Sequence, residues 1–98
     1  MNLNKRSLLW LDKVNKTGLY LEVKNLIEGK SVDVGYRATC GCTDKTRKDY
    51  NIFMKFIAAI KSQGIIVTQN PVKHGNAYAT NNGGFWISYI FNIENHKG

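Results

Sequence analysis

The residues best suited to chemistry in this chain form a short run of hydroxyl and cationic side chains in its middle third. The run contains Thr43, Lys45, Thr46, Arg47 and Lys48. Ammonium and guanidinium groups attract anions, hydroxyls donate hydrogen bonds to phosphate oxygens, and the planar fork of arginine matches O6 and N7 of guanine. Two acids, Asp44 and Asp49, partly offset these charges. The pattern favours binding of a phosphate backbone, with Arg47 as the candidate for a guanine contact.

Three further positions carry candidate contacts. Arg37 precedes the central run and is suited to a flanking phosphate, whereas Lys73 and His74 lie within residues 69–84, which are rich in turn formers. Lys5 and Arg6 add positive charge near the N-terminus. His74 has no evident nucleophile or carboxylate partner close by in the sequence, so we predict that the protein is not an enzyme.

Composition favours a polyanionic partner. Fourteen Lys and Arg against seven Asp and Glu give the 98 residues a formal net charge of +7, although lysine richness without a nucleic-acid role is the alternative. No segment reaches the length of roughly 20 apolar residues that a membrane span needs. The apolar run at residues 8–11 is too short for a signal peptide, so we expect a cytoplasmic protein without a membrane partner.

The cysteines and histidines do not form a standard metal signature. Cys40 and Cys42 are separated by one glycine, a spacing that makes a disulfide geometrically awkward. A zinc site would need two more ligands, and the only histidines are His74 and His96. We therefore predict no metal and no cofactor, and interpret the cysteines as structural thiols.

Hydrophobic spacing predicts a single α+β domain over residues 1–98, with helices first and a β-hairpin last. Residues 1–16 form an N-terminal helical extension, residues 17–64 the helical part and residues 65–93 the hairpin. The spacing predicts helices at 3–15 and 43–63, the second ended by Gly64. Residues 17–28 fit either a strand or a helix, and we favour a helix because the apolar set extends to Ile27 before Gly29.

The order of these elements resembles a winged helix-turn-helix over residues 17–91. Residues 34–38 resemble the start of the second helix, residues 40–46 take the place of the turn and of the recognition-helix start, and residues 60–66 resemble the passage into the wing. Residues 84–91 are similar to the last wing strand of some plasmid and phage replication proteins. However, Val32, Val34 and Tyr36 also alternate as a strand would, and a strand there would remove the helix-turn-helix.

The resemblance implies a small DNA-binding regulator or replication accessory factor of a phage, plasmid or mobile element, with homodimerisation as an option. The recognition helix would enter the major groove, and the hairpin tip with Lys73 and His74 would contact the neighbouring groove. Two other functions stay open. One is a phage-type module that inhibits a host nucleoprotein machine, and the other is RNA binding in which Trp86 and Tyr89 stack on bases.

Overall fold

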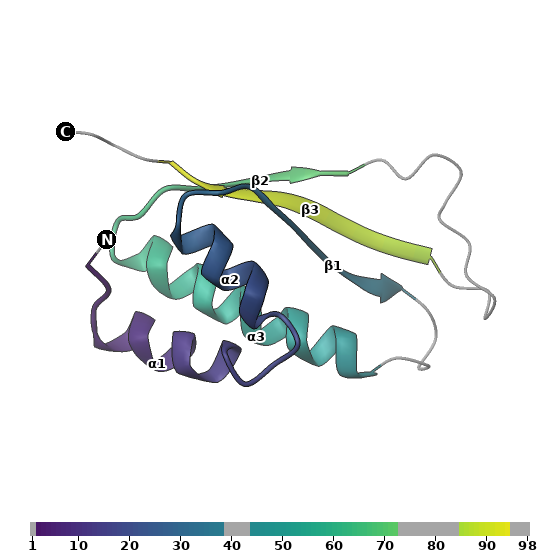
Figure 1. The fold of residues 1–98 in the computed structure, drawn as a ribbon, viewed down its shortest axis with the longest axis horizontal. Coiled ribbons are helices and arrows are strands. Elements are labelled where there is room, and N and C mark those ends of the chain that lie inside the picture. The colour runs from purple at the N-terminus through teal and green to yellow at the C-terminus, as the bar shows by residue number, and fades with distance from the viewer. Residues whose placement is uncertain (1, 39–43, 73–84, 95–98) are drawn as a thin grey trace.

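The computed structural model describes residues 2–38, 44–72 and 85–94, which form an α+β fold (Figure 1). The elements follow the order α1 (Lys5–Val14), α2 (Tyr20–Ile27), β1 (Val32–Ala38), α3 (Asp44–Ser62), β2 (Val67–Pro71) and β3 (Phe85–Ile93). The strands form one antiparallel sheet in the order β1-β3-β2. The coarse α+β prediction is therefore confirmed.

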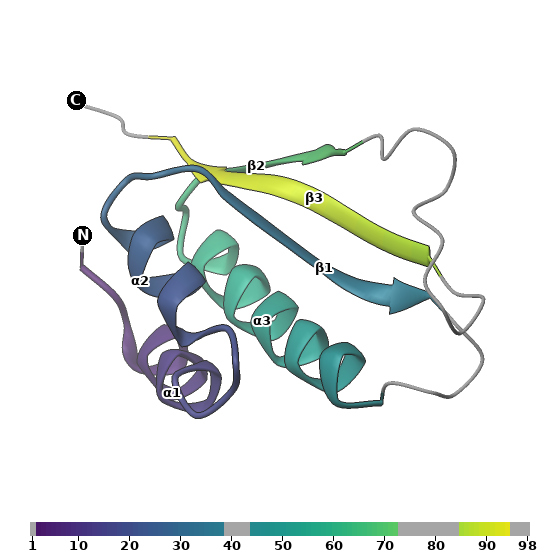
Figure 2. The same ribbon diagram turned by 45° about the vertical axis from the view of Figure 1, so that its right-hand side comes forward.

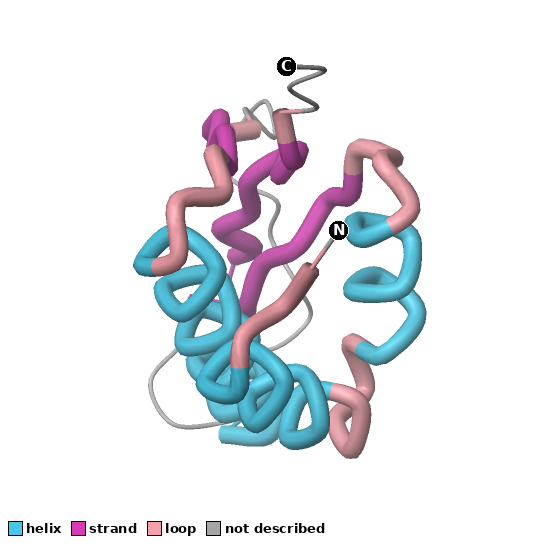
Figure 3. The backbone as a smooth tube through the Cα atoms, turned by 90° about the vertical axis from the view of Figure 1, so that its left-hand side faces the viewer, coloured by secondary structure: helices cyan, strands magenta, loops and turns pink. Residues whose placement is uncertain are grey.

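The helices gather on one face of this sheet (Figure 3). The long helix α3 packs against β1 on one side and against α1 on the other, while α2 contacts both β1 and β3. The core lies where these layers meet, and its largest fully buried side chains come from α3 and β3. They include the edge-to-face pair Phe53 and Phe91, whose ring centroids lie 5.0 Å apart.

The helix boundaries follow local capping chemistry, and the stop predicted at Gly64 is confirmed. The Asn4 side chain accepts a hydrogen bond from the Ser7 N–H at the start of α1. Helices α2 and α3 each end at a glycine with positive φ, Gly29 at 93° and Gly64 at 99°. Past Gly64, the Ile65 N–H donates to the Ile60 carbonyl at 3.0 Å, which closes a Schellman motif. The preference for helix within residues 17–28 is thus confirmed by α2.

The sequence-based assignment of residues 34–38 to a second helix is wrong, because these residues belong to β1. Val32 and Val34 point into the core, whereas Asp33 between them is exposed. Their alternation matches a strand with one buried face, and β1 pairs along its whole length with β3. A helix-turn-helix requires two consecutive helices, and within the described residues only α3 stands between β1 and β2.

The C-terminal hairpin is confirmed, with shifted boundaries. Strands β2 and β3 pair in antiparallel register, from Val67 opposite Ile93 to Pro71 opposite Tyr89. The first strand begins at Val67 rather than at Ile65, because the Ile65 N–H is used to end α3. The suggested strand at 77–79 lies outside the described residues.

Candidate nucleic-acid interface

The start of α3 lies at the same end of the molecule as the last residues of β1 and the first residues of β3 (Figures 1 and 2). The register brings Ala38 opposite Phe85 and Arg37 opposite Trp86 at this end. Strand β2 ends earlier, at Pro71 opposite Tyr89 in the middle of β3. The topology therefore brings the start of α3, the end of β1 and the start of β3 to one end of the molecule.

Arg47 lies over an aromatic pair at the start of α3. Its guanidinium carbon is 5.2 Å from the ring centroid of Tyr36 on β1, a cation–π distance. The Tyr36 ring in turn packs on Tyr50 of α3, with centroids 4.8 Å apart and ring planes inclined by 51°. Arg47 is exposed, so its charge stays available to an external anion while the stacking limits the orientations of its side chain.

Tyr50 is the buried member of this cluster, with 9% of its surface exposed. Burial, reinforced by the nearby Tyr89 and Tyr36, raises the pKa of Tyr50 to about 12. Tyr89 is half-buried and packs edge-on against the buried Phe91, with ring centroids 6.3 Å apart. Tyr89 thus belongs to the layer between sheet and helices, which argues against its use as a free platform for base stacking.

The first half of α3 exposes a polar stripe. Exposed positions recur at helical spacing at Arg47, Lys48 and Asn51, and the stripe continues into the second half of the helix at Lys55. The first half of the helix extends past the end of α1 (Figures 1 and 2). The turn between α1 and α2 contacts α3 beside the stripe, where the Gly18 N–H donates to Asp49 at 3.1 Å. Arginine and asparagine are residue types that read guanine and adenine, and lysine binds phosphate.

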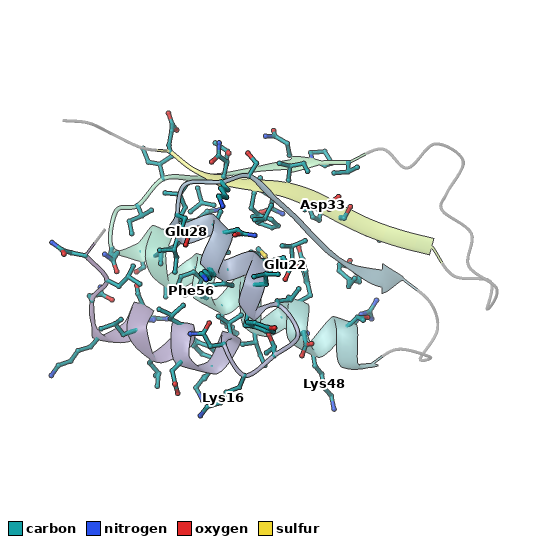
Figure 4. All side chains as sticks on the ribbon, viewed as in Figure 1. Lys16, Glu22, Glu28, Asp33, Lys48 and Phe56 are labelled. Carbon is teal, nitrogen blue, oxygen red and sulfur yellow. The ribbon has the colours of Figure 1, made fainter. Side chains whose placement is uncertain are left out.

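Helix α1 adds a second cationic surface beside α3. Helix α1 and the turn after it carry four exposed cations, Lys5, Arg6, Lys13 and Lys16. Figure 4 shows that Lys16 and Lys48 both point away from the sheet. The Lys16 ammonium lies 3.4 Å from Asp12, and the Lys13 ammonium lies 5.5 Å from the centroid of Trp10. We call α1 and the stripe on α3 together the basic helical face.

The predicted contact residues fall into three groups. Arg47 and Lys48 are exposed on α3, and Thr46 beside them is half-buried. Arg37 and Lys45 are placed by their backbone alone, in β1 and in the first turn of α3. Thr43, Lys73 and His74 lie outside the described residues, as do the two cysteines and His96.

Sequence reasoning missed part of the basic helical face. Lys13, Lys16, Asn51 and Lys55 are not among the contacts predicted from the sequence, although the helical spacing of Lys5 and Lys13 already places them away from the apolar side of α1. The packing of α1 against α3 could not be predicted from the spacing of residues in the sequence. It includes long-range hydrogen bonds of Gln63, whose side chain binds Asn2, Asn4 and Ser7 at the start of α1.

An apolar groove lies on the other side of α1. It has a volume of about 330 Å³ between α1 and α2 and is lined by Leu11, Asn15, Tyr20, Val23, Lys24, Ile27 and Glu28. Tyr20 and Leu21 on α2 are about half exposed, at 57% and 51%. Apolar side chains gathered in this way are typical of a surface that contacts another molecule.

Neither family models, curated proteins nor solved structures gave a match to this chain. None of the helices described is long and apolar enough to cross a membrane. Within residues 2–38, 44–72 and 85–94, no cluster of three or more His, Cys, Asp or Glu side chains is arranged to hold a metal ion.

Proposed function

We propose that this protein binds nucleic acid, duplex DNA in the first place, through the exposed first half of α3 and the adjoining surface of α1. The observation that carries the proposal is the pair Arg47 and Lys48. Both are exposed at the start of a helix that projects past its neighbour, and among the described residues neither forms an ion pair. Cations presented in this way are free to replace the counterions of a phosphate backbone.

The stripe on α3 fits a major groove better than a flat surface. An α-helix enters the major groove when one face is free along the first turns and carries polar side chains. Arg47, Asn51 and Lys55 lie on such a face, while the opposite face of α3 is fixed by the core. The cations of α1 would contact the sugar–phosphate backbone beside the groove.

The proposal retains one part of the winged-helix resemblance and gives up another. The passage from α3 into the antiparallel strands β2 and β3 supports a helix followed by a wing, with Lys73 and His74 in the connection between the strands. The helix-turn-helix pair is given up because β1 occupies residues 32–38, where the resemblance places the helix before the turn. A role in regulation or replication of a mobile element remains our hypothesis for the process served.

The test is a titration of fluorescently labelled random-sequence duplex DNA with the full chain at several salt concentrations. We expect log K to fall linearly with log salt, with a slope of about −0.9 for each phosphate contacted. Arg47→Ala with Lys48→Ala should weaken binding at least about tenfold and make the slope shallower by about 2, because on random-sequence DNA both cations contact phosphates.

A matched variant controls for net charge. Lys24→Ala with Lys30→Ala removes the same charge from α2 and from the connection to β1, away from the start of α3. In this control the slope of log K against log salt should differ from the wild-type slope by less than the value for one phosphate contact, about 0.9. Equal weakening of binding by both double variants would mean that net charge, rather than the α3 surface, attracts DNA. Binding to single strands alone would contradict the duplex proposal.

A second candidate function is protein binding through the groove between α1 and α2. The apolar lining and the half-exposed Tyr20 favour it, since a groove of this kind accepts an amphipathic helix. Tyr20→Ala with Leu21→Ala separates the two functions. Loss of DNA binding in this variant, with the fold intact, would connect the groove to the nucleic-acid surface, whereas unchanged DNA binding leaves the groove for a protein partner.

A further inference from the structure

The two outer strands of the sheet differ in their open edges. Strand β2 is short and ends in Pro71, which lacks an N–H. Strand β1 is longer and contains no proline, and its pairing with β3 runs from Val32 to Ala38 without a bulge. Proline, short length and bulges are the devices that block further strand pairing at a sheet edge. Of the two open edges, β1 is therefore the one suited to accept another strand.

The alternation of hydrogen bonds along β3 shows which backbone N–H and C=O groups of β1 point away from β3, toward the open edge. The Val72 N–H donates to the Ser88 carbonyl at 3.0 Å, so the backbone groups of Ser88 point toward β2. Those of its neighbours Ile87 and Tyr89 must then point toward β1, where their register partners are Tyr36 and Val34. It follows that the intervening residues of β1, namely Asp33, Gly35 and Arg37, direct their N–H and C=O groups to the open edge.

These groups have no other backbone partner in the part of the chain that the structure describes. None of the turn, loop and cap hydrogen bonds there uses a backbone group of Asp33, Gly35 or Arg37. Helix α2 precedes β1 and packs on the helical side of the sheet, against β1 and β3. Figure 3 shows β1 as an outer strand of the sheet. An unpaired edge of this length is a template for pairing with another chain.

We propose that the open edge of β1 is a homodimer interface, in which β1 of a second copy pairs antiparallel with it about a two-fold axis at Gly35. In this register Asp33 lies opposite Arg37 of the second copy, and Arg37 opposite its Asp33. The residues with open backbone groups face one another, so the hydrogen bonds form in phase. The interface therefore carries two cross-strand pairs of opposite charge, related by the two-fold axis.

The charges select this register over its neighbours. An axis at Val34 or at Tyr36 keeps the hydrogen bonds in phase but loses both pairs of opposite charge, because Asp33 and Arg37 then no longer face each other. An axis at Asp33 or at Arg37 brings two like charges opposite each other, which is unfavourable in a cross-strand pair. A register shift of one residue, which places the axis between two residues, takes the hydrogen bonds out of phase. Gly35 itself does not select the register. A Cβ at Gly35 would lie 2.2 Å from the Ile87 carbonyl oxygen, so β3 already requires glycine there.

The dimer would be a continuous sheet in the order β2-β3-β1-β1-β3-β2 with all helices on one side. A two-fold axis perpendicular to an antiparallel sheet keeps the same face of both copies on the same side. Both copies of α3 would therefore face in one direction. The dimer itself follows from the β1 edge and does not depend on nucleic-acid binding.

The experiment is sedimentation of the full chain over a range of concentrations, with reversed charges at the edge. We expect the wild type to shift with concentration from 11.1 kDa to about twice that mass. Asp33→Arg and Arg37→Asp should each weaken self-association at least about tenfold, because each places like charges opposite one another twice. The double variant Asp33→Arg/Arg37→Asp should regain the wild-type dimer.

The most specific test of the charge pairs is to mix the two single variants. Asp33→Arg has only cations at the edge and Arg37→Asp only anions, so an equimolar mixture should form the dimer that neither forms alone. Asp12→Arg, an equal charge change on an exposed residue of α1, should leave dimerisation unchanged. Far-ultraviolet circular dichroism verifies that each variant is folded.

Amide hydrogen exchange measures whether the dimer interface lies at the edge of β1. The N–H groups of Asp33, Gly35 and Arg37 should exchange more slowly as the wild-type concentration rises. A wild type that stays monomeric up to millimolar concentration would overturn the proposal. So would single variants that dimerise as well as the wild type, or a dimer whose three edge amides exchange at the monomer rate.

Discussion

The two halves of α3 perform different tasks in one continuous helix. From Phe53 onward the helix is enclosed between the sheet and α1, and Phe53, Phe56 and Ile60 are fully buried. Before Phe53 the helix extends past α1 and exposes Arg47, Lys48 and Asn51. The difference indicates that the second half maintains the fold and thereby positions the first. Substitutions in the second half should lower stability, and those in the first half should lower binding.

The largest effect is expected in the enclosed half. Phe56→Ala removes a fully buried aromatic side chain and leaves a cavity, so it should lower the free energy of unfolding by about 3–5 kcal/mol. Urea unfolding measures this loss. Lys55→Ala, at the adjacent exposed position, should change stability by less than about 0.5 kcal/mol. Similar losses at both positions would mean that the second half is not enclosed as described.

The boundary between the halves is marked by Tyr50, whose effect depends on pH. Its pKa in the folded protein, about 12, lies above the value of 10.0 for an unperturbed tyrosine. The unfolded chain therefore loses the proton first, and stability falls as pH rises from about 10 to about 12. The loss should amount to about 2–3 kcal/mol.

Tyr50→Phe tests this assignment by urea unfolding at pH 8 and at pH 11.5. The substitution should remove the tyrosine part of the alkaline loss, which the difference between the two proteins then measures. Tyr20→Phe, a change at an exposed tyrosine on α2, should retain the wild-type loss. An identical pH dependence in wild type and Tyr50→Phe would contradict the burial of Tyr50.

A smaller effect is expected where α3 ends on α1. The Ser7 hydroxyl is fully buried and donates to the Gln63 side chain at 2.6 Å, so Gln63→Ala leaves a buried donor unpaired. We expect a loss of about 1–2 kcal/mol. The double variant Ser7→Ala/Gln63→Ala should be less destabilised than the sum of the single variants, as measured by a double-mutant cycle. Simple additivity would show that the two side chains act independently.

The smallest effect on stability belongs to the exposed half. Arg47→Ala should cost about 0.5–1 kcal/mol through loss of its contact with Tyr36, and Lys48→Ala close to nothing. Their combined effect on DNA affinity should be larger than their effect on unfolding. If Arg47→Ala with Lys48→Ala costs more free energy of unfolding than free energy of DNA binding, the proposed difference between the two halves is wrong.

Much of the helical architecture could be predicted because it depends on neighbours in the sequence. The apolar spacing in residues 43–63, the cap at Asn4 and the glycine at position 64 define α1 and α3 within their own segments. Residues 34–38 could not be assigned in this way. Their alternation is short, and the β3 residues that complete the strand lie about 50 positions later in the chain.

For the candidate interface, too, local features could be predicted from the sequence and tertiary contacts could not. The sequence placed Arg47 and Lys48 at the start of a helix, and both are exposed there. The stacking of Arg47 on Tyr36 could not be foreseen, because it requires β1 beside α3. The contribution of Lys13 and Lys16 likewise depends on α1 packing against α3.

The sequence by itself determined the net charge of +7, the helices with their caps and the cationic start of α3, since each arises from composition or from residues within one or two helical turns. The tertiary structure decided that residues 32–38 form a strand, that Tyr50 is buried and that the edge of β1 stays open. The physical reason is that strand pairing, burial and edge exposure depend on segments far apart in the chain. Only the folded arrangement specifies which of those segments meet.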